Sequence, residues 1–178
     1  MNATFARAVL ARPRLLPVAA LLASGALLGG AWAFQLGGGL APCELCHWQR
    51  YPHYAALALA LLLLPLGRGA PGRLLGLFAL LFGLAWLASA GVSVFHVGVE
   101  QHWWKGLEAC GAGGIDGTLS IEALKAQILA APVIRCDEVP WSLFGISLAG
   151  YNALISGGLA VLAALTTARL FALDRERP

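Results

Sequence analysis

Charged residues are scarce in this sequence: only 12% of its 178 residues are Asp, Glu, Lys or Arg, whereas 59% are hydrophobic. That composition is far from an average soluble domain and excludes the ordinary soluble globular class. No hydrophilic stretch is long enough for a separate soluble domain, and no basic block suggests a nucleic-acid partner. What remains are several apolar runs near the length of about 20 residues that crosses a bilayer as a helix.

Cysteine is also scarce, and the few cysteines present are placed informatively. All four lie outside the apolar runs: Cys43, Cys46, Cys110 and Cys136. Cysteines are generally among the most buried residues, so their exclusion from the apolar runs is unusual. An even number in the polar segments suggests two pairs in an oxidising compartment.

The apolar runs predict an all-α membrane protein, a four-transmembrane-helix bundle forming a single domain over residues 1–178. The expected spans are residues 15–34, 48–66, 74–95 and 143–165. A turn rich in glycine and arginine at residues 67–73 predicts that the second and third spans are antiparallel neighbours. The basic N-terminus and Ala31-Trp32-Ala33 also resemble a signal peptide. Because the apolar run exceeds the usual core of roughly 7–15 residues, we expect this span to be retained.

The arginines predict the orientation of the bundle. Four spans place eight of them on the side of the two termini: Arg7, Arg12, Arg14, Arg68, Arg73, Arg169, Arg175 and Arg177. Only Lys105, Lys125 and Arg135 lie firmly on the other side, with Arg50 at the boundary. The positive-inside rule then makes both termini cytoplasmic and puts all four cysteines on the opposite side.

Two loops are expected on the cysteine side, at residues 35–47 and 96–142. In the longer loop, Thr118 can cap a helix from Leu119 to about Ala131 that ends at Pro132. Its apolar positions share one face, which predicts a short amphipathic helix lying on the membrane surface. Packing of this helix on the spans is an equally good interpretation.

Residues 42–50 carry the candidate chemistry. A Cys-x-x-Cys disulfide closes a very small ring, which makes it a poor staple but a good redox couple. If the helix begins near Trp48, Cys46 lies at a helix N-terminus, where the partial positive charge favours the thiolate. Arg50 follows one turn later and keeps its charge. The sequence therefore predicts a reactive thiolate beside a fixed cation at a membrane edge.

Other interpretations of these residues remain open. Cys43 to His47 also fits the attachment signature of c-type haem, although haem leaves the other two cysteines unexplained. A four-cysteine zinc site would normally use two closely spaced pairs, so we expect neither metal nor haem. Arg50 could be an interfacial anchor, and His96 and Gln49 could be ordinary polar residues at helix ends rather than ligand-binding residues.

Three stretches together resemble the DsbB family of bacterial disulfide bond formation proteins. They are Pro-Cys-x-x-Cys-x-x-x-Arg at residues 42–50, His-Val-Gly-Val-Glu at 96–100, and Cys-Asp-Glu-Val-Pro-Trp at 136–141. The resemblance covers nearly the whole chain. It implies a multi-pass protein of the bacterial inner membrane with periplasmic cysteines, which reoxidises a DsbA-type thiol oxidase and passes the electrons to ubiquinone or menaquinone.

The resemblance also assigns roles. We expect the resting protein to hold Cys43–Cys46 and Cys110–Cys136 disulfides. The resemblance implies that Cys110 forms the mixed disulfide with the partner, that Cys136 attacks Cys43, and that Cys46 donates to a quinone near Arg50. We expect Arg50, His96 and Gln49 to bind the quinone. The family pattern allows an acidic residue at position 49, so the glutamine here puts a proton-handling role in doubt. The alternatives are a non-enzymatic membrane protein with two structural disulfides and a quinone reductase similar to vitamin K epoxide reductase.

Overall fold

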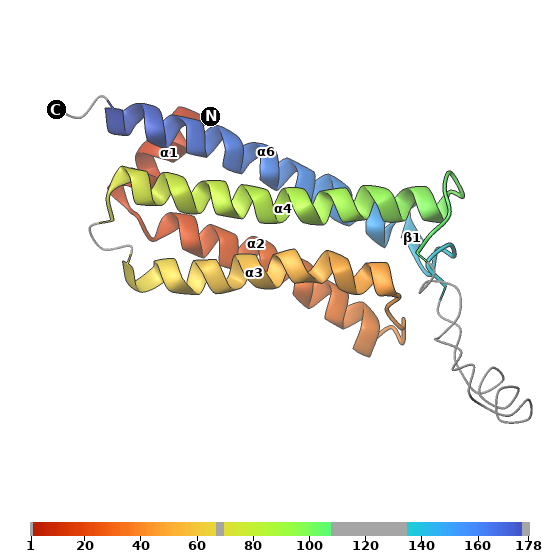
Figure 1. The fold of residues 1–178 in the computed structure, drawn as a ribbon. Coiled ribbons are helices and arrows are strands. Elements are labelled where there is room, and N and C mark those ends of the chain that lie inside the picture. The colour runs from red at the N-terminus through yellow and green to blue at the C-terminus, as the bar shows by residue number, and fades with distance from the viewer. Residues whose placement is uncertain (1, 67–69, 108–134, 176–178) are drawn as a thin grey trace, which may run out of the picture.

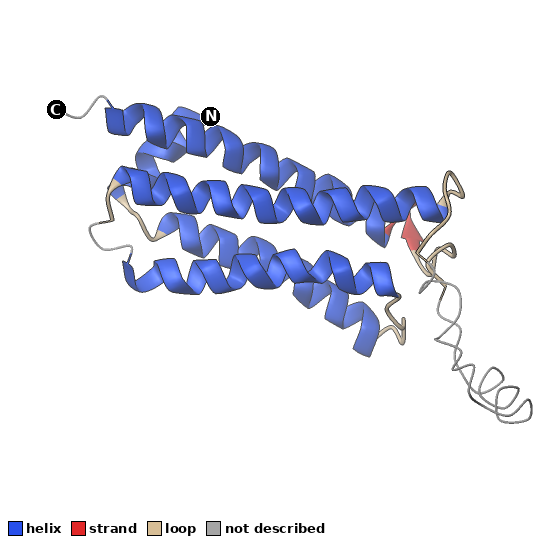
Figure 2. Cartoon of the chain, viewed as in Figure 1, coloured by secondary structure: helices blue, strands red, loops and turns tan. Residues whose placement is uncertain are grey.

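The computed structural model describes residues 2–66, 70–107 and 135–175, and these residues are mostly helical (Figures 1 and 2). The elements in chain order are α1 (Asn2–Ala11), α2 (Leu15–Leu36), α3 (Glu44–Leu66), α4 (Gly72–Glu100), β1 (Ser142–Leu143), β2 (Ile146–Ser147) and α6 (Leu148–Arg175). The long helices run side by side, with the N-terminal helix α1 lying against α6 (Figure 1).

The bundle is held together by apolar side chains and by small residues that let helices approach closely. Phe82, Leu63 and Leu170 are fully buried in its core. The pair α4 and α6 has the most extensive contact, and a Cβ at Gly83 would lie only 3.1 Å from the Cβ of Ala163. Small residues at such contacts are typical of membrane helices, because association there depends on close packing.

Three of the described helices are long and apolar enough to cross a membrane: Leu15–Leu36, Gly72–Glu100 and Leu148–Arg175. The all-α, multi-pass membrane class is therefore confirmed. Helix α3 lies against α2 and α4 but is not among the three. Its N-terminal part carries polar side chains, including Gln49, Arg50 and His53, so the count of four spans stays a prediction.

The predicted start of the last span at residue 143 is wrong. Residues 142–147 form a small antiparallel hairpin in which Leu143 faces Ile146, and α6 begins only at Leu148. Phe144 and Gly145 make the turn with positive φ values of 51° and 76°, as two-residue hairpin turns require. The Ser147 hydroxyl then accepts the backbone N–H of Gly150 at 3.1 Å and caps α6.

Other boundaries also differ from the prediction. Helix α3 begins at Glu44, four residues earlier than expected, and α4 continues to Glu100 rather than ending at residue 95. The first connecting loop is therefore shorter than the predicted 35–47, and the second is shifted along the chain from 96–142 to 101–147. Helix α1 was not predicted, although its Ala6 and Val9 are fully buried. The helix predicted at residues 119–131 lies outside the described residues.

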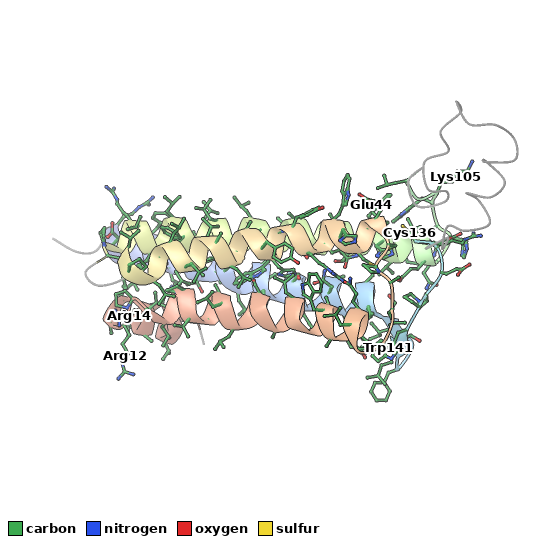
Figure 3. The ribbon with its side chains drawn as sticks, turned by 90° about the horizontal axis from the view of Figure 1, so that it is seen from below. Arg12, Arg14, Glu44, Lys105, Cys136 and Trp141 are labelled. Carbon is green, nitrogen blue, oxygen red and sulfur yellow. The ribbon has the colours of Figure 1, made fainter. Side chains whose placement is uncertain are left out.

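The two ends of the bundle differ in chemistry. Figure 3 shows Arg12 and Arg14 at one end, and Glu44 and Cys136 at the other. Arg12 and Arg14 are thus separated from Cys136 along the long axis, whereas Lys105 lies at the cysteine end. Which end faces the cytoplasm stays a prediction.

Candidate active site

One face of α3 gathers the candidate residues around a cavity. Cys46, Gln49, Arg50 and His53 recur at helical spacing, which places them on the same side of the helix. The cavity has a volume of about 410 Å³ and lies between α2, α3, α4 and α6. Its lining includes two thiols and four polar or charged side chains: Cys43, Cys46, Gln49, Arg50, His96 and Asn152.

The Cys-x-x-Cys pair is a dithiol in this structure. Cys43 and Cys46 are free, and their sulfur atoms are 3.0 Å apart, which is longer than the bond of about 2.05 Å in a disulfide. Cys43 occupies the N-cap position of α3, where its Sγ accepts the backbone N–H of Cys46 at 3.3 Å. A small movement therefore suffices to bond the two sulfurs. The predicted resting Cys43–Cys46 disulfide stays a prediction.

The two thiols have unequal acidity. The hydrogen bond from Cys43 lowers the pKa of Cys46 to about 7, with further help from the charge of Arg50 and against the effect of burial. The same hydrogen bond raises the pKa of Cys43, which retains its proton, and burial adds to this rise. Cys46 is therefore the more acidic thiol of the pair and the one that ionises first.

Arg50 is buried inside the bundle and does not extend to the surface as an anchor. Only 8% of it is exposed; its guanidinium donates to Gln35 Oε1 at 2.7 Å and stacks on Trp32 at 5.3 Å from the ring centroid. Among the described residues it forms no ion pair with a carboxylate. Its charge is therefore available to the Cys46 thiolate and to an acceptor in the cavity.

His96 lies beside the thiols, and Gln49 contacts His96. Nε2 of His96 lies 3.6 Å from Cys43 Sγ, and Nδ1 lies 2.7 Å from the amide nitrogen of Gln49. Both side chains are almost fully buried. The structure thus joins residues from α3 and α4 that are far apart in the sequence. Their roles in ligand binding stay predictions.

The second cysteine pair is only partly within the described residues. Cys136 is fully buried and disulfide-bonded, and it belongs to the same buried cluster as Cys43, Leu45 and Val99. Its neighbourhood places it close to the Cys-x-x-Cys end of α3. Cys110 lies outside the described residues, so the pairing of Cys110 with Cys136 stays a prediction.

Several buried polar residues at the site were missed by sequence reasoning. His53 and Glu100 line the cavity with Asn152, and three serines lie behind them: Ser89, Ser93 and Ser156. Glu100 accepts a 2.5 Å hydrogen bond from Ser147. Polar side chains inside membrane helices are costly and usually functional, so their occurrence within otherwise apolar runs is the signal that could have found them.

Three potential ligand atoms at the site lie close enough together to bind one metal ion. The ligand atoms of Cys43, Cys46 and His96 all lie within 4.8 Å of one another. The histidine in this group is His96 and not the neighbouring His47 of the haem-like signature. Because thiolate and imidazole are good ligands for soft divalent metals, the expected absence of a metal stays a prediction.

The fold and the site define a helical membrane protein with a redox dithiol at one end of its bundle. Comparison with known families is specific: residues 13–166 match the family model described as disulfide bond formation protein DsbB. The chain belongs to the DsbB family.

Individual relatives agree with this assignment. The chain is 35% identical over 163 residues to disulfide bond formation protein B 2 of Pseudomonas syringae pv. syringae, covering 86% of this chain and 87% of the relative. It is 29% identical over 147 residues to disulfide bond formation protein B of Methylobacillus flagellatus, covering 81% and 86%. No solved structure matches. The family favours the DsbB-like alternative over the one similar to vitamin K epoxide reductase.

Proposed function

We propose that this protein is a quinone-dependent disulfide oxidoreductase of the bacterial inner membrane that reoxidises a periplasmic DsbA-type thiol oxidase. The observation that carries the proposal is the dithiol of Cys43 and Cys46, with sulfurs 3.0 Å apart, at a cavity that Arg50 also lines. In this proposal the chain crosses the membrane four times with both termini in the cytoplasm, and the cysteines face the periplasm.

The cavity suits a quinone ring. Its volume of about 410 Å³ falls within the range of roughly 300–1,000 Å³ typical of small-molecule sites. Leu27, Ala31 and Phe34 of α2 supply apolar walls. The buried guanidinium of Arg50 supplies hydrogen-bond donors and a positive charge for a carbonyl oxygen that gains electrons. Ubiquinone and menaquinone both have a carbonyl oxygen that gains electrons, so both fit the proposal.

The chemistry proposed for the chain is a two-step relay. The partner's dithiol attacks the Cys110–Cys136 disulfide, and Cys110 forms the mixed disulfide. The freed Cys136 thiolate attacks Cys43 of the oxidised Cys43–Cys46 pair: a Cys136–Cys43 disulfide forms, the Cys43–Cys46 bond breaks, and Cys46 leaves as a thiolate. In the complete cycle, two thiols lose two electrons and two protons and form one disulfide, and the quinone takes them up to become a quinol. Arg50 stabilises the thiolate of Cys46 before this transfer.

The test is oxidation of a reduced DsbA-type protein by the purified chain in detergent. Oxidation should be catalytic in the presence of ubiquinone or menaquinone and absent without a quinone. Failure with both quinones, by a chain that retains its helical content, would favour the alternative of two structural disulfides. Cys46→Ala is the control, because it leaves the second pair intact and removes the proposed donor.

A further inference from the structure

A continuous chain of hydrogen bonds leads from the backbone of α3 and α4 to the imidazole of His96. It starts at two serines of α4: the Ser93 hydroxyl donates to the Ser89 carbonyl at 2.7 Å, and the Ser89 hydroxyl donates to the Gln49 carbonyl at 3.1 Å. A hydroxyl has one proton to donate. The Ser93 hydroxyl has used its proton on the backbone, and so has the Ser89 hydroxyl, whose oxygen also lies 3.1 Å from His53 Nε2. Toward Asn152 both oxygens therefore accept.

These two serines fix the orientation of the Asn152 amide. One end of that amide lies 3.0 Å from Ser89 Oγ and 2.7 Å from Ser93 Oγ. Because both oxygens only accept, this end must be the nitrogen. The opposite end accepts the Ser156 hydroxyl at 2.9 Å and faces His53 Nε2 at 3.2 Å, as a carbonyl oxygen should. The orientation of Asn152 is thus set without reference to the thiol site.

Asn152 in turn fixes Gln49, and Gln49 fixes His96. The Asn152 nitrogen lies 3.0 Å from Gln49 Oε1, so the amide nitrogen of Gln49 must be the end that lies 2.7 Å from His96 Nδ1. An amide nitrogen only donates, so Nδ1 is the acceptor and carries no proton. The proton of the neutral ring is therefore on Nε2, the nitrogen 3.6 Å from Cys43 Sγ.

The surroundings of Nε2 agree with a donor at this position. Its neighbours are the sulfur of Cys43 and, at 4.0 Å, the carboxyl oxygen of Glu100. Both groups can accept a hydrogen bond. Nε2–H thus lies between the Cys43 sulfur and the Glu100 carboxyl.

We propose that Asn152 and Gln49 are positioning residues that hold His96 in the Nε2–H tautomer, so that His96 donates to the Cys43 sulfur and does not act as its base. The role of this tautomer in thiol oxidation rests on the proposed function. When the reduced dithiol is oxidised, Cys43 must lose its proton before it bonds to Cys46. His96 stabilises the anionic sulfur, while the proton leaves by another route and is finally taken up with the electrons by the quinone.

Position 49 gives the inference a sharp contrast. A carboxylate there would accept a hydrogen bond from Nδ1–H, which favours the opposite tautomer or the charged imidazolium. Gln49→Glu should therefore change His96 from a neutral Nε2–H donor into a ring protonated on Nδ1. Asn152→Leu removes the group that orients the Gln49 amide and should produce a mixture of tautomers.

The experiment is nitrogen NMR of the full chain in detergent, labelled with ¹⁵N-histidine and kept reduced. His96→Gln identifies the His96 signals. In the unmodified chain, Nδ1 should resonate as an unprotonated and Nε2 as a protonated imidazole nitrogen, and both should shift in Gln49→Glu and Asn152→Leu. Ser156→Ala is the matched control: it removes a hydrogen bond on the oxygen side of Asn152 and should leave the His96 signals unchanged.

Unshifted His47 and His102 signals would show that each variant is folded. A proton on Nδ1 of His96 in the unmodified chain would overturn the inference, and so would unchanged His96 signals in Gln49→Glu. This readout requires no quinone, so failure of the proposed quinone chemistry and failure of the tautomer assignment can be told apart.

Discussion

At the scale of single residues, the acidity of Cys46 is the property on which the site depends. The largest cause of its lowered pKa is the hydrogen bond from Cys43, and the charge of Arg50 is a smaller cause. Glu100 acts in the opposite direction. The structure therefore ranks the effects of the neighbours, which the sequence alone did not do.

We predict the pH dependence of Cys46 alkylation from this ranking. In the reduced chain, the rate should rise with pH around a midpoint of about 7, because the thiolate is the reacting form and the ordinary value is 9.0. Cys43→Ala should move the midpoint upward, and Arg50→Met should move it upward by less. Mass spectrometry of iodoacetamide-treated protein gives the profile, and an equal or larger shift in Arg50→Met would contradict the ranking.

We also predict that Arg50 binds the quinone that accepts the electrons. Arg50→Met keeps much of the bulk and should raise the KM for quinone and slow turnover. A charged hydrogen bond is worth about 1.5–3 kcal/mol, or roughly ten- to a hundredfold. Arg50→Lys restores the charge but not the guanidinium geometry and should recover part of the loss. Quinone reduction measured against quinone concentration is the test; unchanged kinetics in Arg50→Met would place the acceptor elsewhere.

At the scale of the elements, the sequence predicted types better than boundaries. The long apolar runs correctly marked α2, α4 and α6, because bilayer-length hydrophobicity is a strong signal. The run beginning at Leu143 was misleading, since Phe144 and Gly145 turn the chain within an apolar stretch. Cys43 capping the backbone N–H of Cys46 extends α3 into the motif, and a cysteine cap is not a common start signal.

The close approach of α4 and α6 gives a prediction about packing. Gly83→Leu should destabilise the bundle by about 1–3 kcal/mol, because the new side chain meets Ala163 at an interface with no space. Gly91→Leu is the control on the same helix, where a Cβ would have nothing within 4 Å. Thermal unfolding in detergent compares the two variants. Equal melting temperatures would show that Gly83 does not set the α4–α6 distance.

At the scale of the whole molecule, the candidate site is built across the bundle. The sequence predicted the thiols and Arg50 because their spacing lies within one helix. It gave only weak grounds for His96 and none for Asn152, because α4 and α6 meet α3 only in the folded structure. The polar residues of three helices become one network through tertiary packing, which local patterns do not encode.

The orientation of the molecule is open to a direct test. Cysteine-free variants with a single cysteine at Arg12 or at Lys105 should differ in labelling by a membrane-impermeant maleimide in spheroplasts. The positive-inside rule predicts labelling at position 105 and protection at position 12. The reverse pattern would place the Cys-x-x-Cys end of the bundle in the cytoplasm and exclude the periplasmic partner.

The central claim is that electrons pass directly from Cys43 and Cys46 to a quinone. The most direct measurement uses a chain with Cys110→Ala and Cys136→Ala, reduced, freed of reductant and mixed with ubiquinone or menaquinone without oxygen. Absorbance should show one equivalent of quinone reduced per chain, and mass spectrometry should show Cys43 and Cys46 joined in a disulfide. Intact thiols and unreduced quinone, with the bundle still folded, would contradict the account.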